Sequence, residues 1–171
     1  MKKIVLAYSG GLDTTYCAIH LRAQGYEVHA VTIQTGGFSS EELRDIESRA
    51  WSLGIASYQL IDVTQQYYES CIKYLIYGNV LKNNVYPLSV SAERMVQAMA
   101  VANYAQSINA GFVAHGSTGA GNDQVRFDMV FQTLMPEVEV VTPIRDQKLS
   151  REDEINFLKA HGVAMNFEKA Q

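Results

Sequence analysis

Short, almost continuously apolar runs alternate with longer stretches of helical periodicity along this chain. Five of these runs have the length of a strand, and their apolar character is typical of strands buried on both faces. They cover residues 4–8, 28–33, 57–61, 112–115 and 138–141. Because helix-length segments separate them, the pattern predicts a parallel sheet with helices on both faces, the doubly wound α/β arrangement.

Two of the helix-length segments carry recognisable start signals. Ser39 followed by Glu42 fits a capping box, and Gly54 stands where that helix would end. Ser150 followed by Asp153 predicts a similar start for the last helix.

A third helix is predicted over residues 92–108, with apolar residues on one face at Met95, Met99, Ala102 and Ala105. Residues 78–91 are interpreted as one long irregular connection. The ten tyrosines of the chain could suggest a surface that stacks on bases. Several have core-like spacings, however, so we expect packing in the core and at its rim. These are Tyr58, Tyr67, Tyr68, Tyr74 and Tyr77.

Length and composition indicate one globular domain. The chain has 171 residues, of which 47% are hydrophobic and 19% charged, enough apolar material for a core. Its net charge of -4 argues against non-specific nucleic-acid binding, and no apolar run approaches a membrane-spanning length. Cys17 and Cys71 have no metal-ligand neighbours in the sequence, so we expect reduced thiols in a cytoplasmic protein.

The first apolar run leads directly into residues 9–14, Ser-Gly-Gly-Leu-Asp-Thr. Ligands of doubly wound sheets bind at the carboxyl ends of the strands, near the point where strand order reverses. Two glycines let the backbone approach phosphate oxygens closely, and a helix beginning near Leu12 would direct free N–H groups to the same place. Asp13 fits either the first turn of that helix or a contact to Mg²⁺. The segment therefore predicts a phosphate-binding loop.

Two better-known phosphate motifs are absent from this position, namely Gly-x-x-x-x-Gly-Lys-Ser/Thr and Gly-x-Gly-x-x-Gly. The structural alternative is a plain glycine turn that joins a strand to a helix. The full pattern directly after a strand favours phosphate binding over that alternative.

This segment resembles the pyrophosphate loop of the ATP pyrophosphatase families, which split ATP into AMP and pyrophosphate. Within them the chain is similar to argininosuccinate synthase, which opens with Ala-Tyr-Ser-Gly-Gly-Leu-Asp-Thr. Two further segments carry the likeness: residues 86–91, Tyr-Pro-Leu-Ser-Val-Ser, and residues 115–127, His-Gly-Ser-Thr-Gly-Ala-Gly-Asn-Asp-Gln-Val-Arg-Phe. The resemblance implies an adenine nucleotide alpha hydrolase-like fold, with residues 1–171 as a single ATP-binding domain that lacks the family's second synthetase domain.

The resemblance also implies which residues form the site. ATP would be held at Ala7, Tyr8, Ser9, Gly10, Gly11, Leu12, Asp13, Thr14, Thr15 and Gly116. Citrulline would be held by Tyr86, Ser91, Asn122 and Arg126, and aspartate by Thr118, Asn122 and Asp123. These residue types fit, because a guanidinium binds a carboxylate as a fork and a carboxylate accepts hydrogen bonds from an ammonium group. No metal-ligating residue is implied.

Three side chains near these segments have alternative interpretations. Arg94 fits a solvated helix residue and a phosphate contact equally well. His115, at the end of a predicted strand, is at least as well explained by a structural hydrogen bond as by a ligand contact. Arg126 and Asp123 carry opposite charges close together in sequence, so we expect them to pair when no ligand is bound.

The implied activity is ATP-dependent ligation of citrulline and aspartate, giving argininosuccinate, AMP and pyrophosphate, with ATP and Mg²⁺ as cofactors. Partners would be small molecules, with no nucleic acid and no membrane, and full-length family members are homo-oligomers. Ala120 stands where the family usually has lysine. Two alternatives stay open: an isolated or degenerate ATP-binding module without full catalysis, and another AMP-forming enzyme with the same loop.

Overall fold

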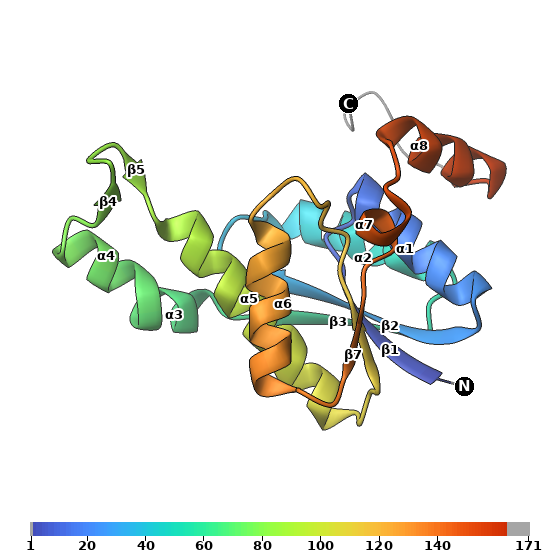
Figure 1. The fold of residues 1–171 in the computed structure, drawn as a ribbon, viewed down its shortest axis with the longest axis horizontal. Coiled ribbons are helices and arrows are strands. Elements are labelled where there is room, and N and C mark those ends of the chain that lie inside the picture. The colour runs from blue at the N-terminus through green and yellow to red at the C-terminus, as the bar shows by residue number, and fades with distance from the viewer. Residues whose placement is uncertain (1, 164–171) are drawn as a thin grey trace.

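A computed structural model describes residues 2–163 as a five-stranded sheet covered by helices, with an extended segment on one side (Figure 1). The sheet strands are β1 (Lys2–Ala7), β2 (Tyr26–Gln34), β3 (Ser57–Asp62), β6 (Phe112–Ala114) and β7 (Glu139–Val141). The covering helices are α1 (Leu12–Ala23), α2 (Ser40–Ser52), α5 (Ser89–Ser107), α6 (Asp123–Leu134), α7 (Pro143–Gln147) and α8 (Arg151–Ala160).

The sheet is parallel throughout, with the strand order β3-β2-β1-β6-β7. The central strand β1 pairs on both sides, so that Val5 lies opposite His29 of β2 and Val113 of β6. The chain adds strands outward from β1 in one direction and then in the other, which places the reversal of strand order between β1 and β6. The predicted doubly wound parallel sheet is confirmed.

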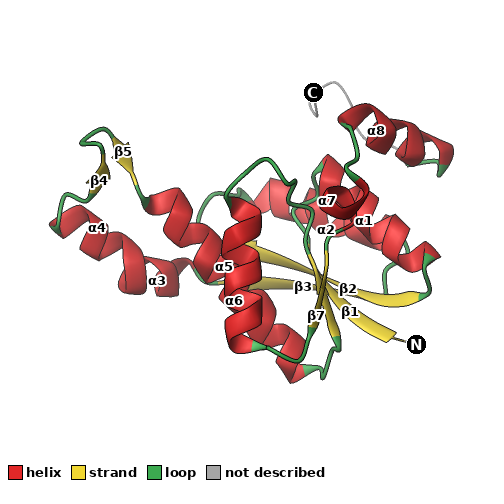
Figure 2. Ribbon diagram, in the orientation of Figure 1, coloured by secondary structure: helices red, strands yellow, loops and turns green. Residues whose placement is uncertain are grey.

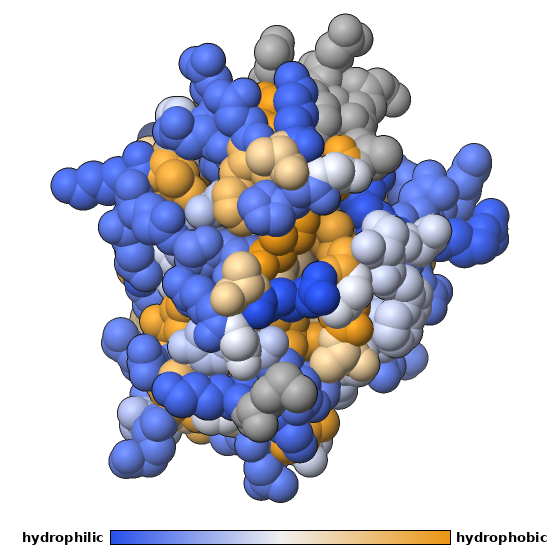
Figure 3. Space-filling view, turned by 90° about the vertical axis from the view of Figure 1, so that its right-hand side faces the viewer, coloured by the Kyte–Doolittle hydropathy of each residue, from blue (hydrophilic) through white to orange (hydrophobic). Residues whose placement is uncertain are grey.

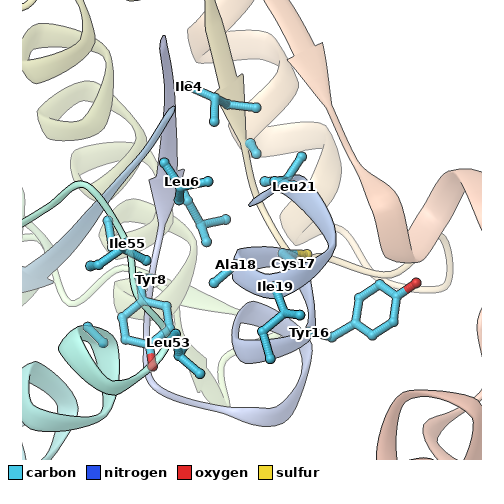
Figure 4. Close-up of a cluster of buried hydrophobic side chains, with 14 of the residues drawn as sticks. Ile4, Leu6, Tyr8, Tyr16, Cys17, Ala18, Ile19, Leu21, Leu53 and Ile55 are labelled. Carbon is cyan, nitrogen blue, oxygen red and sulfur yellow. The ribbon is translucent and has the colours of Figure 1, made fainter. Parts of the chain in front are cut away.

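Helices cover both faces of the sheet (Figure 2). Each face has its own core of buried side chains. Side chains alternate along β1, so Ile4 and Leu6 join the core beneath α1, whereas Val5 joins the core beneath α5 and α6. Figure 4 shows Ala18 and Leu21 of α1 beside Ile4 and Leu6. Both clusters end near the carboxyl edge of the sheet, which gives the loops at that edge a rigid base.

Both capping boxes predicted from the sequence are present. The Ser39 hydroxyl accepts from the backbone N–H of Glu42, whose carboxylate accepts from the Ser39 backbone N–H at 2.8 Å. Ser150 and Asp153 form the same reciprocal pair at the start of α8. These boxes satisfy N–H groups that the first turn of a helix leaves free.

Two details of the predicted pattern are wrong. Strand β3 is not buried on both faces, because it forms an edge of the sheet and leaves Gln59 and Leu60 exposed. Helix α5 begins at Ser89, earlier than expected, and Met99 is exposed while its neighbour Ala98 is fully buried. Both Ala98 and Met99 are apolar, so residue type alone could not show which of them faces the core.

Residues 64–87 form an arm that extends away from the sheet (Figure 1). It consists of α3 (Thr64–Tyr67), the π-helical turn η1 (Tyr68–Ile72), α4 (Lys73–Tyr77), β4 (Leu81–Lys82) and β5 (Tyr86–Pro87). The expected irregular connection therefore contains a short antiparallel hairpin. The expectation for the tyrosines is wrong in part: Tyr67 is buried, but Tyr68, Tyr74 and Tyr77 are exposed.

No helix among residues 2–163 is both long enough and apolar enough to cross a membrane. On the face shown in Figure 3, hydrophilic side chains surround apolar residues that gather near its centre.

Candidate functional site

Two loops meet at the carboxyl edge of the sheet, where the strand order reverses. One loop follows β1 and leads into α1, and the other follows β6 and leads into α6. Because β1 and β6 are neighbours in the sheet, the two loops lie side by side. They border a cavity of about 950 Å³, which is large enough for a nucleotide-sized ligand.

The loop after β1 is shaped by its glycines. Gly10 has a φ of +74°, and a Cβ placed there would lie 2.9 Å from Cγ1 of Ile46, so neither the backbone conformation nor the space admits a larger residue. Gly11 occupies the N-cap position of α1 and provides no side-chain cap. The first N–H groups of α1 are therefore left without the side-chain partners that α2 and α8 have, which suits an anion.

Hydroxyl groups complete this loop. The backbone N–H of Ser9 donates to Oγ1 of Thr14 at 3.3 Å, and the two hydroxyl oxygens lie 3.2 Å apart. Ser9 is exposed at the cavity, whereas Thr15 is fully buried beneath it. Ser9 and Thr14 can thus turn hydroxyl groups toward a ligand, while Thr15 belongs to the packed base of the helix.

Arg49 is a site residue that the sequence analysis missed. Its guanidinium donates to the carbonyl oxygen of Gly10 and lines the cavity. The residue belongs to the last turn of α2, where a basic side chain is also explained by the helix dipole. Only the packing of α2 against the first loop brings this charge to the site, so no local pattern could have identified it.

The second loop packs directly against the start of α1. A Cβ on Gly116 would lie 3.1 Å from Cβ of Asp13 and 3.2 Å from the backbone nitrogen of Thr14. A side chain at Gly116 would therefore push the two loops apart. The contact makes the loops one continuous surface at the edge of the cavity.

His115 anchors the second loop from below. It is 1% exposed, its Nδ1 accepts from the backbone N–H of Ser117 at 3.2 Å, and its Nε2 therefore carries the hydrogen that is donated to Asp128 at 3.1 Å. Burial lowers the pKa of His115 despite the nearby Asp128 carboxylate. The ring is thus neutral at pH 7. His115 makes the expected structural hydrogen bonds, and it also lines the cavity.

Arg145 of α7 connects this histidine to the loop itself. Its Nη1 donates to Oδ2 of Asp128 at 2.6 Å and to Oε1 of Gln124 at 3.1 Å. Burial alone would raise the pKa of Asp128. The hydrogen bonds from Arg145 and His115 together lower the pKa by more than burial raises it, so the net shift is downward. Gln124 in turn donates to the carbonyl oxygens of Gly119 and Gly121, which fixes the glycine-rich turn.

A charged cluster lies at the start of α6. Asp123 accepts from Arg126 at 2.6 Å and from Nε of Arg94 at 3.2 Å. Arg126 also donates to Oγ of Ser91 at 2.9 Å, so the expected pairing of Arg126 with Asp123 is present. Arg94 is half-buried, contacts Glu93 at 3.3 Å and lines the cavity, which excludes the interpretation as a purely solvated residue.

The structure brings most of the proposed site residues to the cavity. Those of the proposed site residues that line it are Ala7, Tyr8, Ser9, Gly10, Gly11, Leu12, Asp13, Thr14, Gly116, Thr118 and Asp123. Thr15, Tyr86, Ser91, Asn122 and Arg126 do not line it. Tyr86 lies on β5 in the arm and is 52% exposed, and Ala120 is exposed in the second loop. Within residues 2–163, no three His, Cys, Asp or Glu side chains gather in a way that could hold a metal ion.

Comparison with known proteins gives a consistent result. Residues 3–164 match the model of the family described as "Arginosuccinate synthase N-terminal HUP domain". The chain is 38% identical to the argininosuccinate synthase of Sulfurisphaera tokodaii over 99% of its own length, and 39% identical to that of Saccharolobus solfataricus over 97%. It is 37% identical to the enzyme of Staphylococcus haemolyticus over 95% of its length.

The chain spans only 43%, 42% and 40% of the length of these three relatives. A solved structure, described as a predicted subunit of a tRNA methyltransferase from Methanocaldococcus jannaschii, superposes with a TM-score of 0.65 at 17% identity. The match covers 93% of this chain and 75% of the other chain. At this identity it supports the fold alone. The family model and the relatives together show that the chain belongs to the argininosuccinate synthase family, in which it corresponds to the N-terminal HUP domain.

Proposed function

We propose that this domain binds ATP through the loop after β1, as part of a ligase that joins citrulline and aspartate to form argininosuccinate. The observation that carries the proposal is the free N-terminus of α1, which faces the cavity behind a glycine turn. Gly10 leaves no space for a side chain, so phosphate oxygens can approach the backbone N–H groups. The family relationship supports the same assignment.

The phosphates would be contacted by backbone N–H groups of residues 9–14 and by the hydroxyls of Ser9 and Thr14. Arg49 and Arg94 supply positive charge at the same cavity. Ala120 is exposed in the second loop and supplies none. We assign Mg²⁺ to the phosphate oxygens of ATP, which it prefers as a hard cation, and we assign it no ligand from this domain. Ala7, Tyr8, Leu12 and Thr15 would support the loop, and the backbone of Gly116 would complete it.

The amino acids would bind at the second loop and the start of α6. Asp123 can accept hydrogen bonds from an ammonium group, and Thr118 lines the cavity beside it. Arg126 can bind a carboxylate as a fork, and Ser91 already lies at hydrogen-bond distance from it. We therefore propose Thr118, Asn122 and Asp123 for aspartate, and Tyr86, Ser91, Asn122 and Arg126 for citrulline.

In the proposed reaction the ureido oxygen of citrulline attacks the α-phosphate of ATP and displaces pyrophosphate. The amine of aspartate then attacks the resulting activated carbon and displaces AMP, which gives argininosuccinate for arginine biosynthesis. This domain contributes by positioning the reactants and by stabilising the negative charge of the departing pyrophosphate. The partners are small molecules, and we place the protein in the cytoplasm, where free thiols such as Cys17 and Cys71 stay reduced.

A second candidate function is ATP binding without full catalysis, which is favoured by Ala120 at an exposed position of the second loop. Thermal unfolding with and without ATP and Mg²⁺ tests the assignment that both candidates share. At about 100 times its dissociation constant, ATP should add about 2.7 kcal/mol to the free energy of unfolding. An unchanged melting temperature with millimolar ATP would contradict both candidates. Pyrophosphate release with citrulline and aspartate then separates the ligase from the binding module.

A further inference from the structure

Glu154 is a buried acidic residue on a helix whose other acidic residues are exposed. It is 2% exposed, whereas Glu152 and Asp153 of α8 face solvent. Its Oε2 accepts no hydrogen bond from any residue in the described part of the chain. An ionised carboxylate that is buried without donors is costly, so this position requires an explanation.

The explanation lies in the group that Glu154 faces. Its side chain is within hydrogen-bonding reach of the Asp13 carboxyl group, in the first turn of α1. Two carboxyl groups can form a hydrogen bond only when one of them carries a proton. A proton on Glu154 would turn its carboxyl group into a donor and would give the Asp13 carboxylate a partner.

The other groups around Glu154 leave this arrangement in place. On α8, Arg151 attracts the negative charge of Glu154 and Asp153 repels it. From α1, Tyr16 and Cys17 also face Glu154, and both are neutral because burial raises the pKa of each. Burial, followed by the proximity of Asp13, raises the pKa of Glu154 to about 7. The proton on Glu154 is therefore exchanged within the physiological pH range.

We propose that Glu154 is a positioning residue for ATP binding, which holds Asp13 and the first turn of α1 by sharing one proton with the Asp13 carboxyl group. The inference rests on the proposed binding of ATP at the loop after β1. Asp13 lines the cavity and lies 3.1 Å from the Cβ position of Gly116, so its charge acts at the point where the two loops meet. With the proton the pair carries one negative charge, and without it the pair carries two.

The second negative charge has a defined consequence for a polyanionic ligand. The second charge repels the phosphates of ATP bound at the loop after β1. Because the carboxyl pair is partly buried, water screens this repulsion only weakly, and the repulsion favours release of ATP. The affinity for ATP should therefore fall as the pH rises through 7. In this mechanism Glu154 does not touch ATP and acts only through Asp13.

The test is a titration of ATP into the wild-type chain and the Glu154→Gln variant between pH 5.5 and 8.5, in EDTA so that no cation bridges the carboxyl groups. Glutamine keeps a donor to Asp13 but cannot ionise. Phosphate groups titrate near pH 6 themselves, so the comparison is made between proteins at each pH. We expect equal affinity within about twofold at pH 6, and about fivefold tighter binding by Glu154→Gln at pH 8.

Glu152→Gln, which removes an exposed carboxylate from the same helix, is the matched control and should follow the wild type at every pH. Coinciding profiles of the wild type and Glu154→Gln would overturn the inference while leaving ATP binding intact. Absence of ATP binding by the wild type at pH 6 in a parallel titration with Mg²⁺ would instead overturn the proposed function. Carboxyl ¹³C NMR of the wild-type chain measures the protonation of Glu154 without any variant. A titration midpoint of the Glu154 carboxyl group near pH 7 supports the inference, and a midpoint near pH 4.5 contradicts it.

Discussion

At the scale of single residues, Gly10 is the position where the backbone has the least freedom to change. Its positive φ is strained for any residue with a Cβ, and that Cβ would meet Ile46 at 2.9 Å. Ile46 is a buried core residue of α2, so it cannot move away freely. The shape of the first loop and the packing of α2 therefore depend on the same glycine.

We predict that Gly10→Ala abolishes measurable ATP binding and lowers the free energy of unfolding by about 1–3 kcal/mol. Thermal melts with and without ATP measure both effects. Gly111→Ala is the control, because Gly111 has an ordinary φ, no atom within 4 Å of a Cβ position and no place at the cavity. ATP stabilisation of Gly10→Ala equal to that of Gly111→Ala would show that the first loop does not bind the phosphates.

At the scale of elements, Arg145 connects α7 to the second loop through Asp128 and Gln124. We predict that Arg145→Ala loosens residues 117–124, because Gln124 loses the donor that orients its amide toward Gly119 and Gly121. Amide hydrogen exchange in this segment should become at least about tenfold faster, a loss of local protection of about 1.4 kcal/mol. Arg44→Ala, an exposed arginine of α2 outside the cavity, should leave the exchange unchanged, and equal rates in both variants would refute the connection.

A second prediction at this scale concerns His115, which lies between β6 and α6. Burial lowers the pKa of His115 in the folded state, so below pH 6.5 the unfolded chain binds a proton that the folded chain excludes. The free energy of unfolding should therefore fall as the pH decreases through 6.5, by at most about 1.4 kcal/mol per pH unit from this group.

The measurement compares the wild type with His115→Gln by urea unfolding between pH 7.5 and 5. The advantage of the wild type over the variant should shrink as the pH falls. The comparison is needed because Glu154 contributes with the opposite sign: its raised pKa means that the folded state binds the proton more tightly, so its contribution to stability is lost as the pH rises toward 7. A constant difference between the two proteins would show that folding does not lower the pKa of His115.

The sequence predicts elements well where a local pattern determines them. All five sheet strands are present at the expected places, and both capping boxes form because each requires only residues three positions apart. The arm was not predicted, because its tyrosines have the spacing of core residues although Tyr68, Tyr74 and Tyr77 are exposed. At the site, the two loops were identified from their motifs. Arg49 and Arg145 were not, because only tertiary packing brings them there.

At the scale of the whole molecule, the reversal of strand order places the loops after β1 and β6, which we propose to bind ATP and aspartate, against each other. Gly116 packs on Asp13 and Thr14, so we expect a ligand that orders one loop to order the other as well. Thr118 and Asp123 line the same cavity as the first loop, whereas Tyr86, Ser91 and Arg126 do not. Aspartate should therefore be coupled to ATP more strongly than citrulline is.

We predict that saturating ATP tightens aspartate binding by about 5–150-fold, and that aspartate tightens ATP binding by the same factor, as linkage requires. Aspartate must also separate Arg126 and Arg94 from Asp123, so its binding without ATP should be weak. Calorimetric titrations of each ligand, with and without the other, measure the coupling, and citrulline should show a smaller factor. Gly116→Ala should reduce the coupling by forcing the loops apart, while Gly111→Ala should preserve it. Equal factors for aspartate and citrulline, or a coupling that survives in Gly116→Ala, would mean that the contact between the loops does not transmit binding.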